Sequence, residues 1–135
     1  MTENFLNEKE LNALLNNPNI TFKVYDSLIS TNKAAKELAE NGAKEGTVIV
    51  AKKQTGGRGR LGRSFYSRIS GGIYMSLLYF TSSSLSDAVS VTTAAAVFVA
   101  EATERATGRK MNIKWVNDVY NDHGKVAGIL TETVK

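Results

Sequence analysis

The chain has 135 residues, of which 42% are hydrophobic, and its formal net charge is +4. This size fits one domain with a substantial core, and no apolar run approaches the length of about 18 residues that a membrane span needs. The absence of cysteine excludes disulfides, thiolate metal sites and cysteine nucleophiles. Because the N-terminus also lacks the features of a signal peptide, we expect a cytoplasmic protein. The modest positive charge suits small anionic substrates and also allows nucleic acid.

The first half of the chain alternates between helical and extended patterns. Apolar residues recur at helical spacing over residues 3–16. Alternation over residues 21–25 predicts a strand. Residues 30–32, with the sequence Ser-Thr-Asn, supply N-cap candidates for a helix that runs to residue 40, and Gly42 is its expected C-terminal stop.

The second half continues with strands expected at residues 46–52 and 73–80. A capping-box pattern at 84–87 predicts the start of the longest helix, which ends near Gly108. That helix is rich in Ala and Val on nearly all sides, so we expect it to be buried against a sheet.

A strand over 111–115, a turn at 121–124 and a returning strand at 125–130 complete the pattern. The only histidine, His123, lies in this turn, and we assign it no metal role. Helices that are segregated from a hairpin predict an α+β fold with a mixed sheet.

The most informative segment is residues 54–63, QTGGRGRLGR, which contains four glycines and three arginines. Glycine lets the backbone approach a ligand closely, and guanidinium groups form paired hydrogen bonds with phosphate or carboxylate. We therefore expect a loop that closes around an anion. The segment also satisfies G-x-G-x-x-G and approaches a Walker A loop, but no helical pattern follows, as both of those motifs require. An Arg-Gly nucleic-acid segment and a solvated basic turn are further readings.

Two polar clusters follow the long helix. Lys114-Trp115-Val116-Asn117-Asp118 places a cation, an amide and a carboxylate at the end of the expected strand. A bend there would let Asn117 and Asp118 reach one site, whereas turn chemistry with a surface lysine explains them equally well. Lys125 begins the returning strand, and Gly128 interrupts it, which marks either close approach to a ligand or a simple bulge.

Together these segments resemble the biotin protein ligases, the biotin–acetyl-CoA-carboxylase ligases, in order and in spacing. The resemblance covers roughly residues 22–135 and rests on Ser30-Thr31-Asn32, on Gln54 with the Gly/Arg run to Arg63, on Lys114-Trp115-x-Asn117-Asp118 and on Lys125-x-x-Gly128.

The resemblance implies a mixed, largely antiparallel α+β sheet with helices packed on it, similar to class II aminoacyl-tRNA synthetases. Residues 1–135 would form one catalytic domain that is incomplete at its C-terminus, without an N-terminal helix-turn-helix or a C-terminal barrel. The implied activity is ATP-dependent conversion of biotin to biotinyl-5′-AMP, followed by transfer to a lysine of a biotin carboxyl carrier protein. A second copy of the chain or a complementing C-terminal chain would be a further partner.

The resemblance also implies residue roles. The catalytic cations would be Arg58, Arg60 and Lys125. The biotin site would comprise Ser30, Thr31, Asn32, Gln54, Gly57, Arg58, Gly59, Arg60, Tyr74, Lys125 and Gly128. The ATP site would comprise Arg60, Arg63, Phe65, Asn117 and Asp118, with Asp118 as a ligand of Mg²⁺.

The sequence departs from the family pattern at two of these motifs. Val116 stands where proline is usual, and Phe65 stands where tryptophan commonly packs by the adenine. A different class of function also fits the composition: a non-catalytic basic domain that binds nucleic acid through the Arg-Gly loop with Tyr66, Tyr74 and Trp115, or an assembly domain with an exposed sheet edge.

Overall fold

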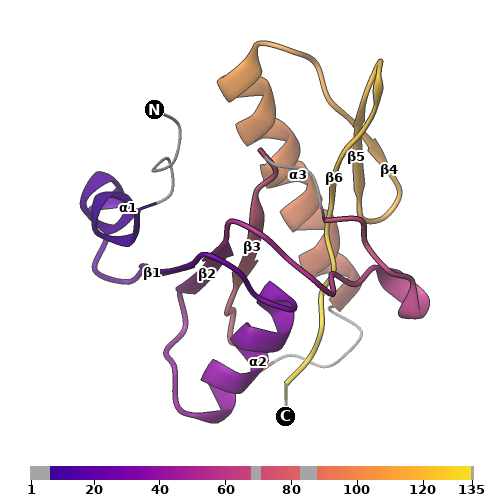
Figure 1. Cartoon of the computed structure of the whole chain (residues 1–135). Coiled ribbons are helices and arrows are strands. Elements are labelled where there is room, and N and C mark those ends of the chain that lie inside the picture. Colours follow the sequence, from indigo (N-terminus) through magenta and orange to yellow (C-terminus); the bar gives the residue numbers. More distant parts are fainter. Residues whose placement is uncertain (1–6, 68–70, 83–87, 135) are drawn as a thin grey trace. The chain divides into compact units, whose positions relative to one another are not determined.

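The strands of the described chain lie in two three-stranded sheets, with the orders β1-β2-β3 and β4-β5-β6. The computed structural model describes residues 7–67, 71–82 and 88–134 (Figure 1). Helices combined with one mixed and one antiparallel sheet confirm the α+β class, although the strands are divided between two sheets.

Each sheet belongs to its own compact unit. The first unit consists chiefly of the chain up to residue 58 and of residues 62–81, and the second consists of residues 59–61 and 82–133. The Gly/Arg segment therefore contributes residues to both units.

β2 (Thr47–Ala51) is the central strand of the first unit, parallel to β1 (Thr21–Tyr25) and antiparallel to β3 (Tyr74–Leu77). All its residues are buried, as expected for a continuous apolar run that is covered on both faces. Gly46 precedes it at φ +82°, where a Cβ would lie 1.9 Å from the carbonyl oxygen of Asn19. Only glycine fits this entry into the strand.

α2 (Thr31–Glu40) connects β1 with β2 and begins where the sequence predicts. Ser30 caps it, because the Ser30 side chain accepts a hydrogen bond from the backbone N–H of Lys33 at 3.3 Å. Gly42 has φ +86° just after the helix, which confirms it as the stop. The core of this unit consists of Ala35, Ile49 and Leu78, with partly buried apolar residues around them.

α1 (Glu8–Leu15) lies beside β1 at the outer edge of this sheet (Figure 1). The side-chain amide of Asn12 accepts from the N–H of Phe22 at 2.8 Å and donates to the carbonyl of the same residue at 3.2 Å. The Glu8 carboxylate accepts from the N–H of Val24 at 3.0 Å. Side chains of α1 thus occupy backbone groups with which another strand would otherwise pair. The helix expected at 3–16 is confirmed from residue 8; residues 1–6 lie outside the described chain.

In the second unit, α3 (Ala88–Thr107) packs on a meander of β4 (Asn112–Lys114), β5 (Asp118–Asn121) and β6 (Gly124–Gly128). The core of this unit consists of Ala100, Met111 and Val119. The expected helix is confirmed up to its end before Gly108, whereas the capping box expected at 84–87 lies outside the described residues.

The expectation that α3 is buried against a sheet is confirmed for one side of the helix, which packs on β4 and β5. Burial is limited to the stripe of Thr92, Ala96 and Ala100, and Phe98 is 68% exposed.

β5 was not predicted from the sequence, because the strand is short and both of its end residues, Asp118 and Asn121, are typical of turns. The expectation that the returning strand pairs with the strand at 111–115 is therefore wrong, because β6 pairs with β5 and not with β4.

Gly128 is not a bulge. It ends β6 directly opposite Asp118, and the register shift lies between Val119 and Tyr120, whose partners are Ala127 and Lys125. Val126 is therefore the extra residue on the bulged strand.

Candidate functional site

The Gly/Arg segment forms a loop that is closed at its base. The N–H of Phe65 donates to the carbonyl of Gly57 at 2.8 Å, and Arg58 bridges to Ser64 in antiparallel fashion. Between these points, a short 3-10 turn at Arg60–Gly62 carries Leu61 at φ 57° with 90% of its surface exposed. No helix follows the loop through residue 67, so both helix-dependent phosphate motifs lack their required context over these residues.

Backbone pairing beyond the ends of β1 and β2 brings the Ser-Thr-Asn segment next to Gln54. Leu28 and Gln54 form a parallel bridge, and the N–H of Gly56 donates to the carbonyl of Ile29 at 2.7 Å. The sheet therefore guides two segments that are far apart in the sequence to one place.

A buried polar network occupies that place. The Gln54 side-chain oxygen accepts from the N–H of Thr31 at 2.8 Å and from the Thr31 hydroxyl at 3.2 Å. The hydroxyl of Ser76 contacts Thr31 Oγ1 at 2.8 Å and Asn32 Oδ1. A hydroxyl carries one hydrogen, so Ser76 can donate to only one of these oxygens at a time.

Ser67 completes the network on the other side of Gln54. Its hydroxyl accepts from Gln54 Nε2 at 3.2 Å and donates to the carbonyl of Phe65 at 3.2 Å. A Cβ on Gly57 would lie 2.5 Å from Ser67 Oγ and 2.9 Å from Gln54 Nε2. This glycine is required because polar side chains pack directly against its backbone.

The sequence interpretation missed Ser67 and Ser76. Ser76 could have been found by alternation, because it follows Tyr74 by two positions and both face inward on β3. Ser67 had no comparable signal, since it lies in an irregular segment and is buried only by tertiary packing.

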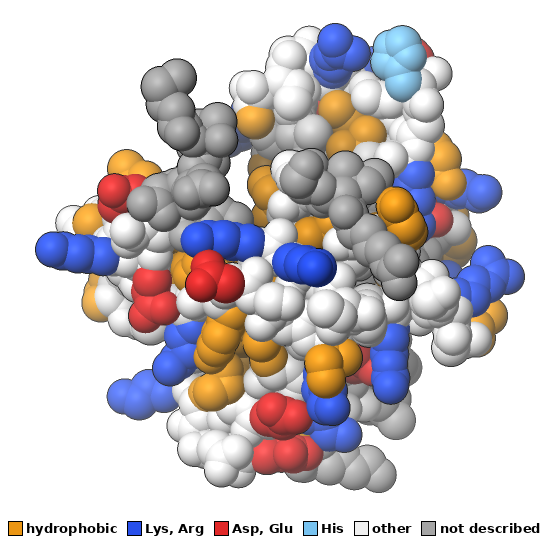
Figure 2. All heavy atoms as spheres, in the orientation of Figure 1, with side chains coloured by type: hydrophobic (Ala, Val, Ile, Leu, Met, Phe, Trp, Pro, Cys, Tyr) orange, Lys and Arg blue, Asp and Glu red, His pale blue; other side chains and the backbone are white. Residues whose placement is uncertain are grey.

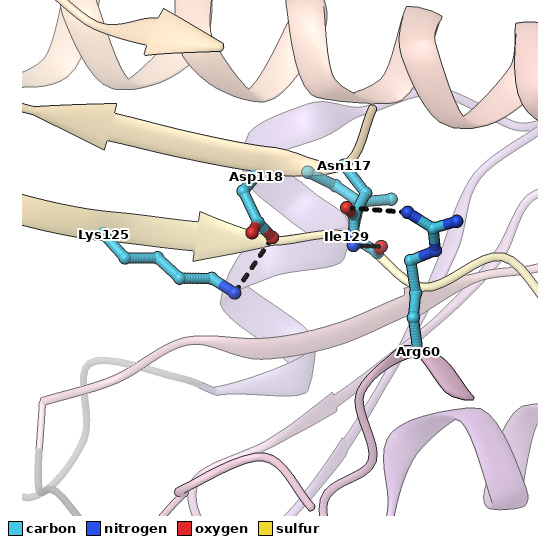
Figure 3. A network of polar contacts seen from close by, with 5 residues as sticks. All are labelled: Arg60, Asn117, Asp118, Lys125 and Ile129. Carbon is cyan, nitrogen blue, oxygen red and sulfur yellow. Dashed lines mark hydrogen bonds and ion pairs between the residues drawn. The ribbon is translucent and has the colours of Figure 1, made fainter. Parts of the chain in front are cut away.

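A second cluster of polar contacts lies in the other unit (Figure 3). Lys125 Nζ is 2.9 Å from Asp118 Oδ1, and the Asp118 side chain is 21% exposed. Arg60 donates to Asn117 Oδ1 at the long distance of 3.5 Å. Asn117 is held in turn by Ile129, through Asn117 Nδ2 to the Ile129 carbonyl at 3.1 Å and through the Ile129 N–H to the Asn117 carbonyl at 2.9 Å.

This geometry explains how the turn before β5 is held. The reciprocal bonds with Ile129 fix Asn117 at the start of the strand, and Asp118 then faces the cation of Lys125 on the neighbouring strand. The Asn-Asp pair is thus engaged in specific side-chain contacts rather than in a solvated turn.

The expected site residues are divided between the units. The first unit contains Ser30, Thr31, Asn32, Gln54, Gly57, Arg58, Arg63, Phe65 and Tyr74, and the second contains Gly59, Arg60, Asn117, Asp118, Lys125 and Gly128. In the first unit, Ser76 contacts Thr31 and Asn32, and Thr31 bonds Gln54. In the second unit, Arg60 bonds Asn117 and Lys125 pairs with Asp118. The convergence of Arg58 and Arg63 with Lys125 remains a prediction.

Over the described residues, no group of three or more His, Asp or Glu side chains is arranged to hold a metal ion. None of the described helices has the length and apolar character needed to cross a bilayer. Figure 2 shows Lys and Arg side chains at several places on the face drawn, with Asp and Glu side chains beside some of them.

Comparisons with known proteins agree on one family. Residues 24–135 match the biotin/lipoate A/B protein ligase family. The bifunctional ligase/repressor BirA of Bacillus subtilis is 45% identical over 108 residues, which is 80% of this chain and 33% of BirA. The chain thus spans about a third of the length of the curated relatives that it matches.

Solved structures give the same result. The biotin protein ligase from Aquifex aeolicus in complex with biotin and ATP is similar with a TM-score of 0.72 and 36% identity, over 84% of this chain and 47% of that one. The biotin acetyl coenzyme A carboxylase synthetase from Helicobacter pylori with bound biotinylated ATP is similar with a TM-score of 0.65 and 27% identity, over 84% and 55%.

Proposed function

Because the chain belongs to the biotin/lipoate A/B protein ligase family, we propose that it takes part in the ATP-dependent activation of biotin to biotinyl-5′-AMP and in its transfer to a carrier lysine. Residues 1–135 constitute the biotin- and phosphate-binding part of the catalytic domain. The observation that carries this proposal is the buried network that joins Thr31 to Gln54, 23 residues apart, next to the closed Gly/Arg loop.

The network suits a ureido ring, which offers both N–H donors and a carbonyl acceptor. Ser30, Thr31, Asn32 and Gln54 supply hydroxyl and amide groups with both donor and acceptor capacity. Gly57 and Gly59 allow close backbone approach, and Tyr74 and Gly128 contribute to the walls. Burial strengthens each of these hydrogen bonds and penalises a ligand that leaves one unmade.

The cations suit the chemical step. Attack of the biotin carboxylate on the α-phosphate of ATP brings two anions together, forms the acyl-phosphate bond and releases pyrophosphate. Arg58, Arg60 and Lys125 offset the repulsion in this step, and Arg63 faces the leaving pyrophosphate. Phe65 packs by the adenine. Lys125 Nζ lies 2.9 Å from Asp118 Oδ1, and its three N–H donors on a flexible stem allow it to contact a substrate anion as well.

Magnesium would be held through ATP. Asp118 is a single carboxylate whose buried Oδ1 is ion-paired with Lys125, and Asn117 supplies an amide oxygen. Such a pair fits an ion that takes most of its ligands from phosphates and water, which is the usual preference of Mg²⁺. When bound, the ion would neutralise phosphate charge, and Asn117 and Asp118 would be the residues that hold it.

The acceptor of the activated biotin is a lysine on a biotin carboxyl carrier protein, whose amine attacks the acyl carbon and displaces AMP. We place the reaction in the cytoplasm, which is consistent with a sequence that contains no cysteine.

The test is incubation of the chain with biotin, ATP and Mg²⁺, with mass spectrometry for biotinyl-5′-AMP and calorimetry for biotin binding. Product formation, or biotin binding without product, is the expected result. If neither is detected, the proposal is wrong. Binding of single-stranded nucleic acid that weakens steeply with salt would instead favour a nucleic-acid-binding domain.

A further inference from the structure

Ser67 contacts both Gln54, a residue of the proposed biotin site, and Phe65, whose N–H closes the Gly/Arg loop. None of the roles assigned above includes Ser67. It is 4% exposed, and its hydroxyl has a defined polarity in the network. Its single hydrogen lies on the carbonyl of Phe65, so a lone pair of its oxygen is available to Gln54 Nε2.

The two partners of the Gln54 amide, Thr31 and Ser67, fix its orientation. The backbone N–H of Thr31 can only donate, so the group 2.8 Å from it must be the Gln54 oxygen. The opposite end of the amide is then the nitrogen, which donates one of its two hydrogens to Ser67. Without an acceptor at Ser67, this second restraint on the amide would be lost.

The same hydroxyl is attached to the base of the Gly/Arg loop. Phe65 is the residue whose N–H closes the loop on Gly57, and its carbonyl takes the hydrogen of Ser67. One side chain therefore contacts both the amide of the proposed biotin site and the backbone that closes the loop.

We infer that Ser67 is a positioning residue for biotin: it holds the Gln54 amide with its nitrogen in a defined place and anchors it to the loop base. This inference rests on the proposed function. Ser67 acts through Gln54, so removing its hydroxyl should weaken biotin binding only while the amide is present.

The experiment is a double-mutant cycle on the full chain, with biotin affinity measured by calorimetry and thermal stability measured alongside. Ser67→Ala should weaken biotin binding about threefold to tenfold, the effect of losing one hydrogen bond. In the Gln54→Ala background the same change should have an effect below about twofold. Ser64→Ala is the matched control, because Ser64 is an exposed serine of the same segment and pairs with Arg58 through its backbone; it should leave affinity unchanged.

The outcomes separate the two proposals. If the unmodified chain does not bind biotin, the proposed function fails. If it binds biotin but Ser67→Ala binds equally well, or loses the same factor with and without Gln54, the positioning role of Ser67 is refuted and the proposed function stands. Loss of thermal stability without loss of affinity would also refute the positioning role.

Discussion

Replacing Gly57 by alanine tests whether the packing around the Gly/Arg loop supports the site. Gly57 does not have a positive φ, so alanine introduces no backbone strain there. The new Cβ would nevertheless lie 2.5 Å from Ser67 Oγ, 2.9 Å from Gln54 Nε2 and 3.1 Å from the carbonyl oxygen of Phe65. The first two distances are shorter than real Cβ contacts, so Ser67 has to move.

The magnitude follows from the bonds that Ser67 makes. Both are already 3.2 Å long, and displacement of the hydroxyl breaks both. Each contributes about 1 kcal/mol to stability, so Gly57→Ala should lower the free energy of unfolding by about 2 kcal/mol. Biotin affinity should fall as well, because the Gln54 amide loses its restraint.

Urea denaturation and calorimetry with biotin measure the two effects. The matched control is Gly62→Ala in the same loop, where φ is +74° and no atom lies within 4 Å of the new Cβ. It should cost about 1 kcal/mol from backbone strain and leave biotin affinity unchanged. The reasoning is refuted if Gly57→Ala has the stability and affinity of the unmodified chain, or if the two variants behave alike.

Three further changes probe other parts of the structure. Asn12→Ala removes both hydrogen bonds to the backbone of Phe22 and should lower the free energy of unfolding in urea by about 1–2 kcal/mol. Because the change also uncovers the β1 edge, it should promote association of chains, measured by light scattering. An unchanged molecular mass would contradict this second expectation. Ile49→Ala creates a cavity at a fully buried position and should cost about 2–4 kcal/mol, whereas the exposed Ile73→Ala should cost far less; equal losses would mean that the core is misplaced. Lys125→Met removes an ion-pair partner of Asp118 and a cation of the proposed phosphate site. Because both side chains are partly exposed, the free energy of unfolding should change by only about 0.5–1 kcal/mol. Binding of an ATP analogue in the presence of biotin should weaken at least tenfold, and unchanged binding would show that Lys125 is not part of the site.

The sequence by itself determined the elements that depend on local chemistry. The N-cap at Ser30, the stop at Gly42 and the buried apolar run of β2 are set by hydrogen bonds and periodicities within a few residues, and each lies where expected. The spacing of the polar motifs also predicted the family to which the chain belongs. These features could be read because their physical causes lie within short segments.

Tertiary structure decided what depends on contacts between distant segments. β5 is a strand because β4 and β6 pair with it on both sides, although its end residues Asp118 and Asn121 are typical of turns. α3 is buried along one stripe because one sheet packs on it within its unit, although its sequence is apolar nearly all round. Ser67 acquires its role only because folding places its hydroxyl between Gln54 and Phe65, and its irregular segment has no periodicity that signals burial.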